Sequence, residues 1–186
     1  MQEKRGFTLL EVLVVVVIAL SVAVFAVPAY KKTQDLNNYT AAQGVLLNLG
    51  SAVRNLQMDA SAAGKDDWPK DNSVQVTASW QNAANATDPD IVSKHKTVAE
   101  LETADFPYAL FAMYMAPIPF TNEMYKGFKF YVCPANTKSS STTDCCNKDR
   151  EVVACMMYAG STRATGDQYY GALFKTDGAL HRLKKK

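Results

Sequence analysis

The chain opens with a long apolar run that contains a single charged residue. From Phe7 to Tyr30 the segment has 24 residues, about 36 Å as a helix, which is enough to cross a bilayer. Glu11 lies near its start, and no Lys, Arg or His occurs between Phe7 and Ala29. An ionised carboxylate in hydrocarbon costs several kcal/mol unless an opposite charge meets it. The charge that stabilises Glu11 must therefore come from outside this segment.

A short polar leader precedes the run and offers one source of that charge. Lys4 and Arg5, next to the apolar residues, are typical of an N-terminus held in the cytoplasm with the rest of the chain outside. Cleavage between Gly6 and Phe7 would create a cationic amine four residues before Glu11. In one helix the two groups would lie about a turn apart. Between two helices offset by about one turn, the amine of one copy would meet Glu11 of the next, which would set the register of stacked helices.

The residues around this junction resemble a known family. The processing site of type IV prepilins and of the pseudopilins of type II secretion systems is similar to Gly6-Phe7-Thr8-Leu9-Leu10-Glu11. The resemblance implies that a prepilin peptidase, which is also a methyltransferase, cuts after Gly6 and methylates Phe7. It implies that Glu11 is the carboxylate through which subunits dock, and that Thr8 belongs to the same assembly motif. Further implied partners are other copies of such chains, an inner-membrane assembly platform and a motor ATPase.

Two plainer interpretations of the N-terminus compete with this one. A secretory signal peptide has a basic start, a short apolar core and a small-residue cleavage site, which Val24-Phe25-Ala26 could supply. Glu11 interrupts that core, however, and Pro28 would follow the cut. A simple single-pass anchor accounts for the length of the run but gives no reason for Glu11. The pilin-like interpretation accounts for both.

The sequence divides into four expected parts. Residues 1–6 are the leader, 7–29 a transmembrane and filament-core helix, 30–64 the amphipathic half of the same helix, and 65–186 an α/β head. Spacings of three and four residues predict an inward-facing stripe of Tyr39, Ala42, Leu46, Leu49, Val53 and Leu56. Pro28 is expected to bend or loosen the helix, and Gly64 to end it near Ala63. Gly44 and Gly50 are each expected to weaken helicity by about 1 kcal/mol relative to alanine.

The fold class expected for the whole is α+β and pilin-like, with the outer half of the long helix packed on a three- or four-stranded antiparallel sheet. Alternating apolar residues predict strands within 74–80, 128–132, 151–158 and 168–175. The run Thr176-Asp177-Gly178 predicts a tight turn before 179–183. Short helical segments are predicted from Thr97 and from about Asp105 to Tyr114.

The four cysteines all lie in the C-terminal third of the chain: Cys133, Cys145, Cys146 and Cys155. The predicted topology exports this part, so disulfides are chemically permitted there. Adjacent Cys145 and Cys146 rarely bond to each other, so each should reach one of the other two. The result would be two bridges tying the loop 134–154 to the sheet, each contributing about 2–4 kcal/mol. Zinc is the less favoured use, because there is no Cys-x-x-Cys pair and the only histidines are His95 and His181.

Composition and motifs give little support to other functions. Without the leader, 18 basic and 17 acidic side chains leave a net charge of +1, which does not indicate nucleic-acid binding. No paired carboxylates, phosphate loop or histidine-containing constellation supports an enzyme, and no cofactor or metal is expected. The acidic groups Asp66-Asp67, Asp88-Pro89-Asp90 and Asp144 lack the dense spacing of a calcium site. The terminal run Lys184-Lys185-Lys186 predicts a solvated end.

These features together predict a structural subunit. We expect an inner-membrane precursor with its N-terminus inside, surrounded by lipid until it enters a helical filament built by one repeated contact. An extracellular type IV pilus is the leading expectation, and a periplasmic type II secretion pseudopilus is the alternative within the family. A minor tip subunit that binds DNA or a surface, and an anchored domain without a filament, are further alternatives. Two departures from the family bear on this choice: 31 residues follow Cys155, and the calcium loop of a major pseudopilin is not evident.

Overall fold

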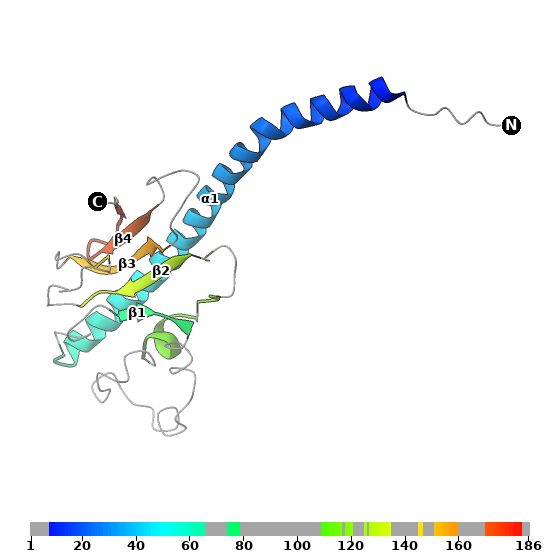
Figure 1. The fold of residues 1–186 in the computed structure, drawn as a ribbon. Coiled ribbons are helices and arrows are strands. Elements are labelled where there is room, and N and C mark those ends of the chain that lie inside the picture. Colours follow the sequence, from blue (N-terminus) through cyan, green and yellow to red (C-terminus); the bar gives the residue numbers. More distant parts are fainter. Residues whose placement is uncertain are drawn as a thin grey trace.

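One long helix and an antiparallel sheet make up the structure, a computed structural model that describes residues 8–65, 74–78, 109–116, 118–120, 125, 127–134, 145–146, 151–159 and 170–183. In chain order the elements are α1 (Leu9–Ala62), β1 (Val74–Val76), the π-helical turn η3 (Ala109–Tyr114), β2 (Phe128–Val132), β3 (Val152–Tyr158), β4 (Gly171–Lys175) and β5 (Leu180–Leu183). Figure 1 shows the sheet lying along the second half of α1, while the first half extends away from it. The expected α+β, pilin-like fold with a disulfide-stapled C-terminal region is confirmed.

Helix α1 begins and ends where its sequence provides caps. Thr8 is the N-cap in extended conformation, and its side chain accepts a hydrogen bond from the backbone N–H of Glu11. Gly64 has φ +78°, a left-handed conformation that glycine adopts without strain, and the helix stops two residues earlier. Pro28 lies inside the helix without ending it, and the ribbon curves before it reaches the sheet (Figure 1).

The sheet has five strands in the order β1-β2-β3-β4-β5, each antiparallel to its neighbour, one strand more than the highest number expected. The extra strand arises because β5 pairs with β4 after the predicted turn, in which Gly178 has φ +84°. Strand β1 is shorter than the predicted range 74–80. The predicted helix at Thr97 lies outside the described residues, whereas the one ending at Tyr114 includes η3.

The main core fills the space between α1 and one face of the sheet. All six residues of the predicted stripe are buried, five of them with no exposed surface: Tyr39, Ala42, Leu46, Leu49, Val53 and Leu56. Alternate residues of β2 meet them from the sheet, Phe128, Phe130 and Val132 among them. Each fully buried large side chain stabilises the fold by about 1.5–3 kcal/mol. This packing fixes the second half of α1 to the head.

Gly50 brings the helix unusually close to strand β4. A Cβ atom at this position would lie 2.3 Å from Cδ1 and Cγ of Phe174, whose side chain is 2% exposed. Nothing lies within 4 Å of the equivalent point at Gly44. The two glycines were expected to act alike on the helix, but only Gly50 has a packing reason to lack a side chain.

The opposite face of the sheet carries a second, smaller core. Side chains from β2, β3 and the cysteine-bearing segments form it: Tyr131, Cys133, Cys145, Cys146, Val152 and Cys155. A register shift between Val152 and Ala154 in β3 interrupts the alternation, so the neighbours Val153 and Ala154 both belong to the main core, while Val152 and Cys155 belong to the second. Among the described residues α1 lies on the other face, so the sulfur-rich cluster stabilises the face that α1 does not cover.

Candidate functional site: the exposed helix and the disulfide pair

The first half of α1 presents apolar side chains in every direction. Most of its large apolar residues between Leu9 and Val27 are about half or more exposed, from Leu9 at 84% to Val14 at 45%. Among the described residues α1 is the one helix long and apolar enough to cross a membrane, and none of its most apolar 18-residue window is buried. So large an apolar surface is not stable in water, and the physical alternatives are lipid or other protein. The second half of the same helix already has its cover in the sheet.

Glu11 lies in the first turn of this exposed helix. Its backbone N–H contacts Thr8 twice, at 3.1 Å to the carbonyl oxygen and 3.3 Å to the side-chain oxygen. An acidic side chain next to the unpaired N–H groups of a helix start is favourable by about 0.3–1 kcal/mol. The structure thus assigns Thr8 a local role as the cap, beside which Glu11 complements the helix dipole. This contribution is too small to offset the burial of a charge in hydrocarbon.

No cation on the helix is within reach of Glu11. The first basic residues after it are Lys31 and Lys32, about 30 Å away along the helix axis at 1.5 Å per residue. The helical register begins at Leu9, because Thr8 has the extended values φ −76° and ψ 149°. Gly6 and Phe7, the predicted processing site, lie outside the described residues. The described residues of α1 therefore do not supply the positive charge that would neutralise Glu11.

This N-terminal segment is similar to a known protein family. Residues 1–27 match the family described as the prokaryotic N-terminal methylation motif, the hallmark of type IV pilins and pseudopilins. The N-terminus is therefore similar to that of type IV pilins and pseudopilins. The match covers the leader, the predicted cleavage site and the exposed half of α1 as far as Val27. No curated protein and no solved structure matches the chain.

Pro28 lies just beyond the matched segment of this pilin-like chain. It has no N–H to donate to the carbonyl of Val24, yet α1 continues through it to Ala62. Polar side chains on both sides bond within the helix: Ser21 donates to the carbonyl of Ile18 at 2.8 Å and Thr33 to that of Ala29 at 3.1 Å. These contacts let polar residues occur in or beside an apolar helix without unpaired hydroxyl groups.

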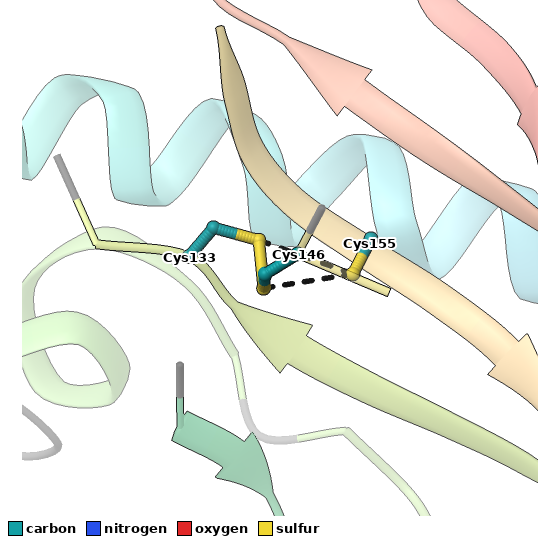
Figure 2. Close-up of side chains that lie close together, drawn as sticks. All are labelled: Cys133, Cys146 and Cys155. Atoms are coloured by element: carbon teal, nitrogen blue, oxygen red, sulfur yellow. Dashed lines mark hydrogen bonds between the residues drawn. A yellow bond between two sulfur atoms is a disulfide. The ribbon is translucent and has the colours of Figure 1, made fainter. Parts of the chain in front are cut away.

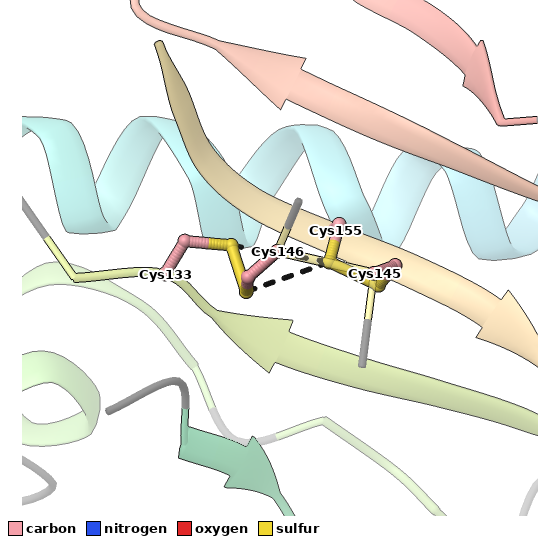
Figure 3. The surroundings of a disulfide bond; sticks show 4 residues. All are labelled: Cys133, Cys145, Cys146 and Cys155. Carbon is pink, nitrogen blue, oxygen red and sulfur yellow. Dashed lines mark hydrogen bonds between the residues drawn. A yellow bond between two sulfur atoms is a disulfide. The ribbon is translucent and has the colours of Figure 1, made fainter. Parts of the chain in front are cut away.

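The four cysteines form two disulfides, and the structure settles the pairing that sequence left open. Cys133 bonds to Cys146 and Cys145 to Cys155, while no cysteine is free. The adjacent pair therefore reaches different partners, as expected. Figure 3 shows the two bridges side by side, linking Cys145 and Cys146 to β3 and to Cys133, just after the end of β2.

The sulfurs of the two bridges are in contact with each other. Sγ of Cys155 lies 3.7 Å from Sγ of Cys146 and 3.9 Å from Sγ of Cys133 (Figure 2). All four cysteines are at most 4% exposed. Three of these sulfurs lie within 4.8 Å of one another, close enough in space for a metal site. In the disulfide form, however, they are not the thiolates that zinc requires.

The remaining polar contacts of the described residues stabilise the fold and form no catalytic constellation. The hydroxyl of Tyr114 in η3 donates a hydrogen bond to the carboxylate of Asp59 on α1. Burial, together with this carboxylate, raises the pKa of Tyr114 to about 12. His181 is an exposed residue 3.4 Å from the carboxylate of Asp177, whose pKa is lowered chiefly by the backbone N–H of Ala179. His95 lies outside the described residues.

A groove also lies between α1 and η3. Its volume is about 400 Å³. The described residues that line it carry amide, hydroxyl and apolar groups: Val45, Asn48, Ser51, Ala52, Asn55, Tyr114, Met115, Ala116, Ile118, Pro119 and Tyr125. Neither a carboxylate nor an imidazole is among them.

Proposed function

We propose that this chain is the structural subunit of a type IV pilus or pilus-like filament, made as an inner-membrane precursor and cut by a prepilin peptidase between Gly6 and Phe7. The observation that carries the proposal is the methylation motif at residues 1–27, leading into a helix whose first half has no protein cover. The peptidase then methylates the new N-terminus at Phe7. The membrane platform and motor ATPase of such systems supply the force for assembly.

In the proposed function the exposed half of α1 is surrounded first by lipid and then by other protein. Before assembly, residues 7–29 lie in lipid with the N-terminus in the cytoplasm and the head outside. In the filament the same surface packs against the helices of other copies. Because one head-to-tail contact is repeated, the assembly stays open and grows as a helix. The head, fixed to the second half of α1 by the main core, becomes the outer shell.

Glu11 is the docking residue in this account. Its partner is the amine at Phe7 of a neighbouring copy, which removes the cost of a lone carboxylate in an apolar core. A contact within the same helix is less favoured, because α1 begins at Leu9 and Thr8 is extended. Thr8 acts beside Glu11 by fixing the start of the helix, and Pro28 allows the helix to bend between its filament-core and head-bound halves.

Incorporation of a Glu11→Gln variant into filaments tests the proposal. The amide keeps the size of the side chain and removes its charge, so the variant should be processed and inserted in the membrane but be absent from sheared filaments. Ser21→Ala is the matched control, because its hydroxyl bonds only to Ile18 within the helix. Equal incorporation of Glu11→Gln and Ser21→Ala would refute the docking role.

The same fractionation separates the two filament types. Peptides of this chain in the fraction sheared from the cell surface identify a pilus. Recovery only with the cell envelope excludes a surface pilus and leaves the periplasmic pseudopilus of a type II secretion system or an anchored domain without a filament.

A further inference from the structure

The two disulfides cross along the sequence. In the order Cys133, Cys145, Cys146 and Cys155, the first cysteine bonds to the third and the second to the fourth. The uncrossed alternative would pair the first with the second and the third with the fourth, and each of its loops would be shorter by one residue. Loop-closure entropy varies with the logarithm of loop length, so chain entropy hardly distinguishes the two isomers.

An oxidant acting on the unfolded head cannot choose between the adjacent cysteines. Cys145 and Cys146 are neighbours in the sequence, so Cys133 meets both at nearly the same distance along the chain. A dithiol oxidase, which donates its own disulfide to two cysteines, should therefore produce both pairings in comparable amounts. Only the folded sheet, which holds Cys133 beside Cys146 and Cys155 beside Cys145, selects the crossed isomer.

The folded head protects whichever pairing it contains. All four cysteines are at most 4% exposed, and thiol–disulfide exchange requires a thiolate to reach a disulfide sulfur. Once the sheet has closed, an external thiol has little access to an incorrect bridge. Correction must therefore take place while the segment of Cys145 and Cys146 is still open, and it needs a catalyst that provides a thiolate at that stage.

In the folded head the sulfurs of the two bridges lie close together. Figures 2 and 3 show the two bridges packed together, with Sγ of Cys155 3.7 Å from that of Cys146 and 3.9 Å from that of Cys133. Partners of both isomers thus belong to one cluster.

We propose that an exported thiol–disulfide isomerase is a folding partner of this chain and converts the uncrossed pairing to the crossed one. Its thiolate attacks Sγ of Cys133, forms a mixed disulfide and releases the thiolate of Cys145. That thiolate attacks Sγ of Cys155, forms the Cys145–Cys155 bridge and releases the thiolate of Cys146. This last thiolate attacks Cys133 in the mixed disulfide, completes the Cys133–Cys146 bridge and releases the isomerase thiolate. No electrons are gained or lost overall, and the catalyst is regenerated.

The test compares the full chain in two bacterial hosts that have an exported dithiol oxidase, with and without the exported isomerase. Newly made chain is trapped by acid and alkylation. Partial reduction, labelling with a second alkylating reagent and fragment-ion sequencing then distinguish Cys145 from Cys146. Without the isomerase we expect the uncrossed isomer in amounts comparable to the crossed one. With the isomerase it should decrease several-fold.

The matched control is the double variant Cys145→Ala/Cys155→Ala. It has one native pair, Cys133 and Cys146, and no alternative partner, so its bridge should form equally well in both hosts. The proposal is overturned if the crossed isomer alone forms without the isomerase, or if the control depends on the isomerase as strongly as the natural chain. The inference rests on export of the head and not on filament assembly, so filament counts do not affect its outcome.

Discussion

The close approach of α1 to β4 allows a paired test of the helix–sheet packing. In Gly50→Ala the new methyl group would lie 2.3 Å from the ring of Phe174, a buried residue of β4. Overpacking of this kind costs about 1–3 kcal/mol, and we expect about 3 because Cβ of Phe174 is also only 2.9 Å away. Alanine in place of glycine returns about 1 kcal/mol of helix propensity. The net loss should be about 2 kcal/mol by these two magnitudes.

Gly44→Ala is the matched control for this change. Nothing lies within 4 Å of its Cβ position, so only the gain of about 1 kcal/mol remains. The two variants should differ by about 3 kcal/mol, or about 6–12 °C in Tm for a chain of this size. Near-ultraviolet circular dichroism of the full chain in detergent follows the aromatic packing during thermal unfolding. If both variants shift Tm upward by similar amounts, the close contact between Gly50 and Phe174 is incorrect.

Three further contacts give predictions of their own. The pKa of Tyr114 is raised from 10.0 to about 12, so the stability linked to its proton is complete below pH 10 and is lost as the pH rises through 12. In urea titrations Tyr114→Phe should reduce the free energy of unfolding by about 1 kcal/mol at neutral pH. The same variant should show a smaller loss of stability between pH 10 and 12. The buried hydroxyl of Tyr39 donates to the carbonyl of Gly171 at 3.0 Å, so Tyr39→Phe should reduce the free energy of unfolding by about 1 kcal/mol in urea; an unchanged value would contradict the contact. Thr8→Ala should destabilise the helix start by about 1 kcal/mol, seen as faster amide hydrogen exchange in the first turn with an unchanged Tm of the head, whereas unchanged exchange would argue against the cap.

Much of the helix could be predicted because its determinants are local. The three- and four-residue spacing from Tyr39 to Leu56 directly specifies the buried face, and all six predicted residues are buried. Gly64 ends the helix within two residues of its predicted end, since a left-handed residue satisfies the last carbonyl groups. The strands at 128–132 and 151–158 could also be predicted from the sequence, because alternation of apolar residues reflects a sheet with two different faces.

The features that sequence did not predict depend on contacts between distant residues. Nothing near Gly50 indicates that Phe174 will pack against it, so its difference from Gly44 appears only in three dimensions. The pairing of Cys133 with Cys146 likewise depends on how the strands place the segment between them. The expected count of three or four strands was one short of the five observed, although the tight turn at 176–178 leading to residues 179–183 was predicted and β5 follows it.

Glu11 shows where sequence and structure contribute different parts of the same argument. Sequence identifies a carboxylate without a partner in an apolar run. The structure adds that Thr8 caps the helix next to it and that the surrounding surface is uncovered. Neither alone identifies the compensating charge, because in the proposed function that charge belongs to a terminus that processing would create on another molecule.

The mass of the N-terminal peptide of the mature chain tests the central claim most directly. The account predicts a peptide that begins at Phe7 and is one methyl group heavier than its sequence, and it predicts that this peptide is lost when Gly6 is replaced. An N-terminus at Met1 would show that no peptidase acts at this site. A chain that begins at Val27 would show that the apolar helix is removed on export, which leaves no filament core and no role for Glu11.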